Sequence, residues 1–375
     1  MTVALLGPVY PYRGGIAHYT ARLAQALYDT GHAPLVVNLT RQYPAALFPG
    51  STQEDTSRQA FETPSVRWVD SMRPDTWIST AARLRRQGVT TLAVQWWHPY
   101  FAPSFGSIAR LCRRAGLDVV FVCHNVEPHE RSPADRLLLR WAYGGASRFV
   151  VHARAERERM EHYARGRRVD VVPHPTYDLF ATGPQPTRQQ AREALGLHGD
   201  DEVALFFGLI RPYKGLPVLL EALAHGRERR RIRLVIAGEC YGDASEVTAQ
   251  IERLGLTDRV TAHLHYIANE EVGRYMQAAD VVVAPYLHAT QSGIVQVAYA
   301  FGVPVITTRV GGIPEVVWQG ETGLLVEPGD RDGLANALVR FFAEGLGPDM
   351  RRGVERRRLE LTWERLARVV AGEPT

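Results

Sequence analysis

The chain has 375 residues, of which 45% are hydrophobic and 22% charged, with three cysteines and a formal net charge of +4. This length allows two domains, and the composition excludes a disordered, collagen-like or disulfide-dense protein. No apolar run approaches the roughly 18 residues of a membrane-spanning helix, so no transmembrane helix is expected. The three cysteines are widely spaced and fit a reducing cytoplasm, where we expect the protein to be located.

Short apolar runs alternate with helical patterns in the first half of the chain. Strands are predicted at residues 3–6, 35–38, 91–95, 119–123, 147–151 and 169–172. Helices are predicted at residues 16–28, 76–87, 105–115 and 154–163. Such alternation indicates βαβ units and a mostly parallel sheet that is covered on both faces.

The pattern breaks at residues 173–187, which hold four prolines and are typical of a linker. It then restarts, with strands predicted at 203–207, 233–237, 260–264, 281–284 and 303–307 and helices at 216–224, 246–254, 269–278, 293–301 and 333–344. The sequence therefore predicts an α/β protein of two Rossmann-like, doubly wound domains, residues 1–175 and 176–359, facing each other across a cleft. Ligands of such sheets lie beyond the carboxyl ends of the strands.

The first strand is followed by a connection rich in glycine and proline that ends in Gly14-Gly15. Because glycine leaves the backbone bare, amides just before a helix can face a phosphate group. The motif is not GxGxxG, which weakens a dinucleotide-binding interpretation. Tight packing alone explains the two glycines equally well.

A sharper cluster follows the strand predicted at 203–207. Arg211 and Lys214 lie three residues apart, just before a helix, where a diphosphate would bind. Lys214 is the single lysine among 44 basic residues, and a compact ammonium group differs chemically from the guanidinium used elsewhere. We therefore favour an anion site over a solvated loop.

A third cluster, Thr290-Gln291-Ser292-Gly293, lies between the strand at 281–284 and the next helix. Capping of the helix accounts for Ser292 and Gly293. The whole run is more polar than a cap requires, so we also expect ligand contact. By contrast, Asp330 of the Asp-Arg-Asp sequence at 330–332 directly precedes a helix, and we interpret it as a cap instead of a metal ligand.

Two histidines, His98 and His124, follow strands of the first half. His124 lies directly after an apolar strand, on the side where substrates bind such sheets, so we expect it to contact substrate; a structural role is the alternative. His129 and Glu130 lack a third ligand at a familiar spacing. We expect no metal site.

Charge is unevenly distributed along the chain. Residues 1–180 carry 22 Arg against 15 Asp and Glu. A basic first half fits an anionic acceptor, peripheral contact of Arg-rich helices with a membrane surface, or simply a solvated Arg-rich surface. The basic residues are scattered and no recognition motif accompanies them, so we expect no nucleic-acid partner.

Several of these segments together resemble the retaining glycosyltransferases called group 1, or family 4, which have the GT-B fold. The matching segments are the Gly14-Gly15 loop and residues 207–215, 279–285, 300–306, 311–317 and 320–326. The resemblance implies transfer of a sugar from a nucleotide-diphosphate sugar, UDP- or GDP-linked, with retention of configuration and without a cofactor. It also implies that a final helix at 360–375 joins the first domain.

By the same resemblance, Arg211 and Lys214 hold the donor diphosphate and His124 faces the transferred sugar, which makes these three the expected catalytic residues. Further donor contacts are expected from Gly14, Gly15, Gly208, Tyr266, Ile267, Thr290, Gln291, Ser292, Gly293 and Ile294. Acceptor-side contacts are expected from His98, Asn125 and Glu127. The acceptor is a glycan, a lipid-linked intermediate or a small hydroxylated molecule.

One departure from the family pattern concerns two glutamates that usually stand eight positions apart. The corresponding residues here are Ala289 and Val297, so this chain resembles a subgroup with Thr-Gln-Ser-Gly in that loop. Two alternatives stay open: a sugar-nucleotide epimerase or phosphorolytic enzyme on the same scaffold, and a non-catalytic protein that binds sugar nucleotides or glycans.

Overall fold

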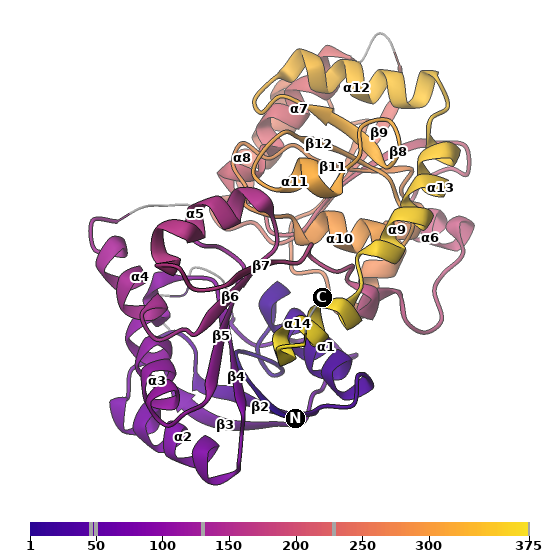
Figure 1. Cartoon of the computed structure of the whole chain (residues 1–375). Helices are drawn as coiled ribbons and strands as arrows, with labels where there is room; N and C mark the ends of the chain where they lie inside the picture. Colours follow the sequence, from indigo (N-terminus) through magenta and orange to yellow (C-terminus); the bar gives the residue numbers. More distant parts are fainter. Residues whose placement is uncertain (45–47, 49–51, 129–131, 227–229, 374–375) are drawn as a thin grey trace. The chain divides into compact units, whose positions relative to one another are not determined.

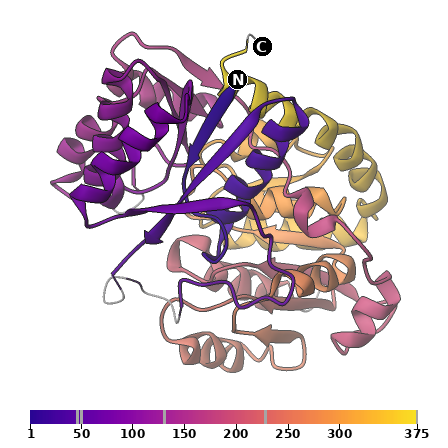
Figure 2. The ribbon, with the colours of Figure 1, turned by 90° about the horizontal axis from the view of Figure 1, so that it is seen from below.

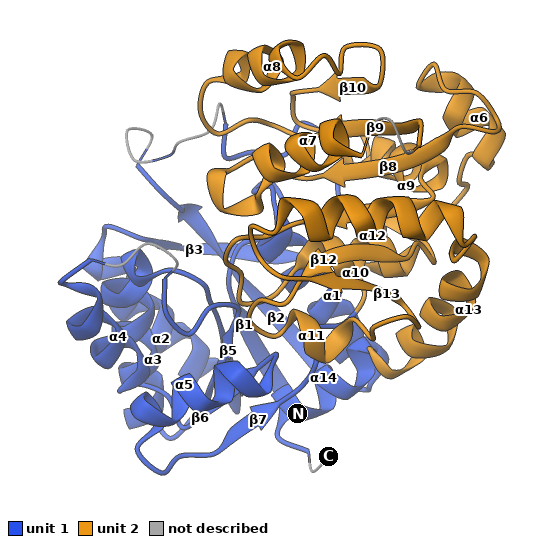
Figure 3. Cartoon of the chain, turned by 90° about the horizontal axis from the view of Figure 1, so that it is seen from above, with its two compact units in different colours: residues 1–56, 60–175, 362–375 blue, residues 57–59, 176–361 orange. Residues whose placement is uncertain are grey.

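The computed structural model describes residues 1–44, 48, 52–128, 132–226 and 230–373. These residues form two compact units (Figure 3). Unit 1 comprises Met1–Thr56, Ala60–Pro175 and Thr362–Thr375, and unit 2 comprises Ser57–Gln59 and Thr176–Leu361. The proline-rich stretch at 173–187 thus contains the residue at which the chain passes from the first unit to the second.

Within its described residues, unit 1 contains a parallel sheet with the strand order β3-β2-β1-β4-β5-β6-β7. The strands are β1 (Thr2–Leu6), β2 (Ala33–Arg41), β3 (Ser65–Asp70), β4 (Thr91–Trp96), β5 (Asp118–Cys123), β6 (Arg148–Val151) and β7 (Val169–Val171). The central strands are apolar runs without alternation because helices cover both faces of the sheet.

The helices of unit 1 lie in two layers (Figure 1 and Figure 2). Their bounds are α1 (Gly15–Asp29), α2 (Pro74–Arg86), α3 (Ala102–Arg114), α4 (Asp135–Tyr143), α5 (Arg154–Ala164) and α14 (Trp363–Ala371). Helices α1 and α14 cover one face, and α2, α3 and α4 cover the other. Right-handed crossovers require this, since the chain moves one way from β1 to β2 and the opposite way from β4 to β7.

Helix α14 belongs to unit 1 although 186 residues of unit 2, Thr176–Leu361, precede it. Its Trp363 ring packs 4.9 Å from the ring of Tyr19 on α1. The buried guanidinium of Arg148 donates to the carbonyl oxygens of Val369 and Val370 at 2.8 and 2.7 Å. The Val369 carbonyl also accepts from the amide of the C-cap residue Gly372 at 3.0 Å, so the Arg148 bonds supplement the cap and attach the end of α14 to β6.

Unit 2, within its described residues, contains a parallel sheet with the order β10-β9-β8-β11-β12-β13. The strands are β8 (Glu202–Phe207), β9 (Ile232–Ala237), β10 (Val260–His263), β11 (Val281–Ala284), β12 (Val305–Thr308) and β13 (Gly323–Val326). The helices are α6 (Arg188–Ala194), α7 (Leu216–His225), α8 (Ala244–Arg253), α9 (Val272–Ala278), α10 (Gly293–Ala300), α11 (Ile313–Val316), α12 (Arg331–Ala343) and α13 (Gly347–Arg357). Helix α7 packs against α12, and α6 packs against α9.

Short 3-10 helices complete the fold: η2 (Pro99–Phe101), η3 (Asp178–Ala181), η4 (Pro212–Lys214), η5 (Asn269–Glu271) and η6 (Arg358–Glu360). Eight predicted bounds were wrong by two or three residues: both ends of β2 and the first residues of α2, α3, α8, α9, α12 and β12. Helix α3 begins at Ala102 because Pro103 fits the first turn of a helix, β12 begins only after Pro304, and the helix predicted at 269–278 opens with η5. Strands β3 and β13 and helices α4, α6, α11 and α13 were not predicted.

Candidate functional site

The carboxyl ends of three neighbouring strands of unit 2, β8, β11 and β12, lie at one edge of the sheet. Parallel register brings together the loops that follow them, residues 208–215, 285–293 and 309–312. The amide of Leu287 donates to the carbonyl of Tyr213 at 2.8 Å, and the amide of Gly312 donates to that of Thr290 at 2.9 Å. The three loops therefore form one bonded assembly.

Two glycines permit this close approach. A Cβ atom on Gly215 would lie 2.0 Å from the carbonyl oxygen of Pro285, and one on Gly311 would lie 2.1 Å from that of Ala289. Both residues also have positive φ angles, 73° and 50°, which other residues adopt only at a cost. The two glycines thus fix how closely the loops approach each other.

Arg211 and Lys214 lie in the first of these loops: Arg211 directly precedes η4, and Lys214 is the last residue of η4. Neither forms an ion pair within the part of the chain that the structure describes. The Arg211 Nε is buried without a hydrogen-bond partner there, and its Cζ lies 4.7 Å from the centre of the Tyr241 ring. Although some of the Lys214 side chain is exposed, dense surroundings lower the pKa of its ammonium group to about 8, and the charge of Arg211 adds to the effect.

The second loop leads into α10. Ser292 caps this helix, since its Oγ accepts from the amide of Val295 at 3.1 Å, and Tyr286 bonds to the same oxygen at 2.9 Å. The capping prediction for Ser292 is confirmed. Both ends of the Gln291 amide are buried without a hydrogen-bond partner among the described residues, which is costly unless a ligand supplies the missing bonds.

The other predicted donor residues are placed as follows. Ile294 lies against Gly208, where an added Cβ would be 2.8 Å from the Ile294 Cδ1 and 3.4 Å from the Lys214 Nζ. Tyr266 and Ile267 follow β10, two strands away from β8, so strand order alone does not bring them to the Lys214 loop. These residues, like Thr290, stay predictions as ligand contacts. Asp330 accepts from the amide of Gly333 at 2.8 Å, and its predicted role as a cap of α12 is confirmed.

In unit 1, Gly14 and Gly15 stand at the start of α1, with Gly14 at a φ of 102°. The preceding loop is held by Asn38, which the sequence reading missed. This fully buried side chain accepts from the amide of Val9 at 3.3 Å and donates to the carbonyl of Tyr10 at 3.0 Å. The Tyr10–Pro11 peptide of this loop is cis.

His124 lies directly after β5, and its Nε2 lies 2.9 Å from Oε1 of Gln95 at the end of the neighbouring strand β4. The residue is only 9% exposed. Burial, and then the nearby His152 and His174, hold the pKa of His124 well below its ordinary value. His124 is therefore a neutral imidazole at neutral pH, suited to hydrogen bonding and not to holding a charge.

His124 belongs to a cluster that the sequence reading missed. His152 follows β6 and His174 follows β7, and both surround the ring of Tyr19, whose hydroxyl lies 3.0 Å from the His152 Nε2. Burial lowers the pKa of His152 to about 4 and that of His174 to about 3. In the sequence, the only indication of this cluster is that His152 and His174 follow the ends of two predicted strands.

The predicted acceptor-side residues have local partners. The His98 Nδ1 accepts from the amide of Tyr100 at 3.1 Å and so caps η2. The Asn125 amide donates to the carbonyl of Trp97 at 3.4 Å, next to His98. Glu127 accepts from the hydroxyl of Tyr163 at 2.8 Å. Strand pairing thus brings His98 and Asn125 to adjoining positions.

His129 and Glu130 lie outside the described residues. Within those residues, no group of three or more His, Cys, Asp or Glu side chains is arranged to hold a metal ion. The helices that the structure describes include none long and apolar enough to cross a membrane.

Two family models match the chain. The model described as "Glycosyltransferase Family 4" matches residues 13–176, and that described as "Glycosyl transferases group 1" matches residues 201–344. Together the two matches span most of the chain and divide it near the junction of the two units.

Among curated proteins, the chain is similar to D-inositol 3-phosphate glycosyltransferases. That of Corynebacterium diphtheriae is 35% identical over 222 residues, covering 57% of this chain and 52% of its own length. That of Pseudarthrobacter chlorophenolicus is 31% identical over 249 residues, covering 65% and 58% respectively. The chain thus spans little more than half the length of these relatives.

Solved structures resemble the chain over nearly its whole length. Sucrose-phosphate synthase from Thermosynechococcus elongatus has a TM-score of 0.76 at 20% identity and covers 99% of this chain and 98% of its own. HepE from Anabaena, solved in complex with UDP, has a TM-score of 0.75 at 19% identity and covers 99% of both chains. These likenesses confirm the predicted fold of two Rossmann-like domains. The chain belongs to the group 1, or family 4, glycosyltransferases of the GT-B fold.

Proposed function

We propose that this glycosyltransferase takes a sugar from a UDP- or GDP-linked donor, without a metal ion, and transfers it to an acceptor hydroxyl with retention of anomeric configuration. The observation that carries the proposal is the pair Arg211 and Lys214, two cations without an ion pair among the described residues of unit 2. A bound anion would supply the counter-charge that these two side chains lack. The HepE structures in complex with UDP and with UDP-glucose support a nucleotide-sugar donor.

The chemistry follows from the charges. When the bond between the anomeric carbon and the diphosphate oxygen breaks, negative charge grows on the leaving group and positive charge on the sugar. Arg211 and Lys214, already in place and partly desolvated, stabilise that leaving group, so the proposal needs no metal ion. Within this ion pair, the acceptor hydroxyl attacks the anomeric carbon on the face from which the diphosphate departs and gives its proton to the departing diphosphate oxygen. The new bond therefore has the configuration of the old one.

Gln291 is proposed as the residue that takes over hydrogen bonding to the donor in the absence of the usual glutamates. Its amide both donates and accepts, so it suits either phosphate oxygens or sugar hydroxyls. His124, neutral and buried, is proposed to hydrogen-bond the transferred sugar. Contact of the Arg-rich helices α2 and α3 with an anionic membrane surface also remains a proposal, supported only by their charge.

The test is calorimetric titration of the protein with UDP, GDP, ADP and TDP in the absence of metal, repeated with Lys214→Ala and Gln291→Ala. We expect tight binding of one nucleotide, weakened by about ten- to a hundredfold in Lys214→Ala because a charged hydrogen bond is lost. Arg340→Ala, which removes an exposed arginine paired with Glu344 in the same unit, is the matched control.

Gln291→Ala carries a second, independent expectation. Removing a buried amide that has no partner leaves the stability of the free protein unchanged or raises it, while nucleotide or donor binding weakens. Product analysis with and without an acceptor then separates transfer from epimerisation. Donor binding without any turnover supports the non-catalytic alternative, and failure of every nucleotide to bind well-folded protein refutes the donor site.

A further inference from the structure

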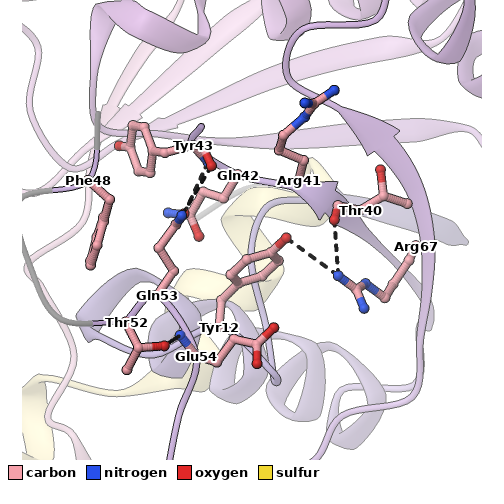
Figure 4. Close-up of a pocket in the computed structure, with 10 residues that line it drawn as sticks. All are labelled: Tyr12, Thr40, Arg41, Gln42, Tyr43, Phe48, Thr52, Gln53, Glu54 and Arg67. Atoms are coloured by element: carbon pink, nitrogen blue, oxygen red, sulfur yellow. Dashed lines mark hydrogen bonds between the residues drawn. The ribbon is translucent and has the colours of Figure 1, made fainter. Parts of the chain in front are cut away.

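The connection between β2 and β3 in unit 1 departs from the pattern of the sheet around it. Neighbouring parallel strands are normally joined through a helix, yet the described residues of the segment 42–64 form none. A long connection between two strands is commonly a binding loop. Described residues of this connection, together with residues of β2, β3 and the loop after β1, line a pocket of about 460 Å³ (Figure 4), a volume typical of small-molecule sites.

One wall of the pocket is the side chain of Tyr43, whose position is fixed from several sides. The side-chain amide of Gln53 forms two hydrogen bonds with the backbone of Tyr43: it accepts from the Tyr43 N–H at 3.0 Å and donates to the Tyr43 carbonyl at 3.1 Å. The Trp97 indole donates to the Tyr43 hydroxyl at 3.0 Å, and the Tyr100 ring lies 5.0 Å away. Tyr43 therefore presents an aromatic surface that needs no ordering when a ligand binds.

The pocket is also attached to the loop that ends in Gly14 and Gly15. The amide of Arg13 donates to the carbonyl of Gln53 at 3.0 Å, and the amide of Asp55 donates to that of Pro11 at 2.7 Å. Between them, Tyr12 lines the pocket with a side chain that is only 6% exposed. The pocket and the glycine loop thus form one bonded structure within unit 1.

Two opposite charges line this space without neutralising each other. Arg67 donates only to neutral oxygens: its Nε to the Leu39 carbonyl at 3.0 Å, and its terminal nitrogen Nη2 to the Thr40 carbonyl at 3.1 Å and to the Tyr12 hydroxyl at 3.5 Å (Figure 4). Glu54 forms no ion pair with any residue that the structure describes, nor does Arg67. Both are exposed to solvent. The second lining arginine, Arg41, is by contrast occupied by Asp70, at 2.6 Å.

We propose that this pocket binds an uncharged sugar ring of the acceptor. Arg67 can only donate hydrogen bonds and Glu54 can only accept them, and the hydroxyl groups of a sugar do both. A simple anion is opposed by Glu54 and a simple cation by Arg67, whereas a neutral polyol satisfies both. The C–H face of the ring packs against Tyr43. This inference rests on the proposed function, because it identifies the acceptor of the transfer as a saccharide.

Ligand-observed NMR on the full chain tests the proposal directly, without donor. The probes are methyl α-D-glucoside, methyl β-D-galactoside and methyl α-D-mannoside, with inorganic phosphate and methyl β-D-glucuronide as anionic comparisons. We expect saturable binding of at least one neutral glycoside, weakened tenfold or more by Glu54→Gln and by Arg67→Gln, since each loses a charged hydrogen bond. Arg157→Gln, from an exposed pair with Glu161 in the same unit, leaves binding unchanged.

Three results overturn the proposal: binding of the anionic probes alone, glycoside binding that both pocket variants leave intact, and no glycoside binding by folded protein. Circular dichroism establishes that each variant is folded. Titration of the same samples with UDP, GDP, ADP and TDP distinguishes failure of the pocket proposal from failure of the proposed function. If one nucleotide binds and no glycoside does, the pocket proposal alone fails; if no nucleotide binds, the proposed donor site fails whatever the glycosides do.

Discussion

The Oε1 atom of Gln95 lies 2.9 Å from Nε2 of His124. The two residues end neighbouring strands, β4 and β5, and both are buried. With the amide oxygen as acceptor, the imidazole carries its single proton on Nε2. Gln95 thereby sets both the orientation and the tautomer of the histidine that we propose to face the transferred sugar.

Replacing Gln95 by Glu tests this relationship. A carboxylate at the same distance favours the imidazolium form, so we expect the pKa of His124 to rise and the histidine to titrate near neutral pH. NMR titration of the imidazole in wild type and Gln95→Glu measures this shift. In wild type the ring should stay neutral down to well below its ordinary pKa, and equal titration curves in the two proteins would show that Gln95 does not govern His124.

The same buried histidines predict acid sensitivity. His124, His152 and His174 have lowered pKa values in the folded protein, so the unfolded chain binds their protons more tightly. As the pH falls from about 6.5 toward 4, the free energy of unfolding should decrease by up to about 1.4 kcal/mol per pH unit for each histidine. Urea unfolding at a series of pH values measures the slope.

His174→Gln should make that slope shallower, whereas His162→Gln, which changes an exposed histidine of α5, should leave it unchanged. A pH-independent free energy of unfolding across this range would mean that the three imidazoles are not desolvated in the folded protein.

Lys214 predicts proton uptake when the donor nucleotide binds. Its pKa of about 8 in the free protein leaves a fraction of the ammonium deprotonated at pH 8, and a bound diphosphate raises that pKa. Calorimetry in buffers of different ionisation enthalpy should reveal uptake of a partial proton near pH 8, together with weaker binding as the pH rises further. Lys214→Arg keeps the charge at every pH and should abolish the uptake; undiminished uptake in that variant would assign the proton to another group.

Comparing Gly215→Ala with Gly345→Ala should distinguish the destabilisation caused by a steric clash from that caused by backbone strain. The new Cβ would stand 2.0 Å from the Pro285 carbonyl oxygen, at a φ of 73°. Gly345→Ala has a similar φ of 63° with no atom within 4 Å of the new Cβ. We expect Gly345→Ala to cost about 1 kcal/mol, the strain alone, and Gly215→Ala to cost more and to weaken nucleotide binding, as measured by urea unfolding and calorimetry. Equal losses would mean that the two loops separate freely.

The sequence predicted the sheets well where strands are continuous apolar runs, as at Val119–Phe121. It missed β3, because Ser65, Arg67 and Asp70 leave no continuous apolar run there. It also missed helices such as α11, which has only four residues, Ile313–Val316. Short elements carry too few residues for a period to be detected.

In the candidate site, Lys214 could be predicted as an anion-binding residue because it is the single lysine of the sequence. Gln95, His152 and the pocket residues Glu54 and Arg67 were not, because their roles depend on strand order and on a connection that lacks any periodic pattern. The order of the strands in the sheet decides which polar residues become buried neighbours. That order cannot be read from local sequence patterns.

The membership of α14 in unit 1 has a consequence for how the chain is made. A ribosome has produced every residue of unit 2 once it reaches Leu361, while unit 1 still lacks the helix that covers Tyr19 and bonds to Arg148. Domains commonly fold during synthesis in the order of their appearance. Unit 1 therefore begins first but is completed only after unit 2, and during that interval the nascent protein carries an apolar face that is covered only once α14 has been synthesised.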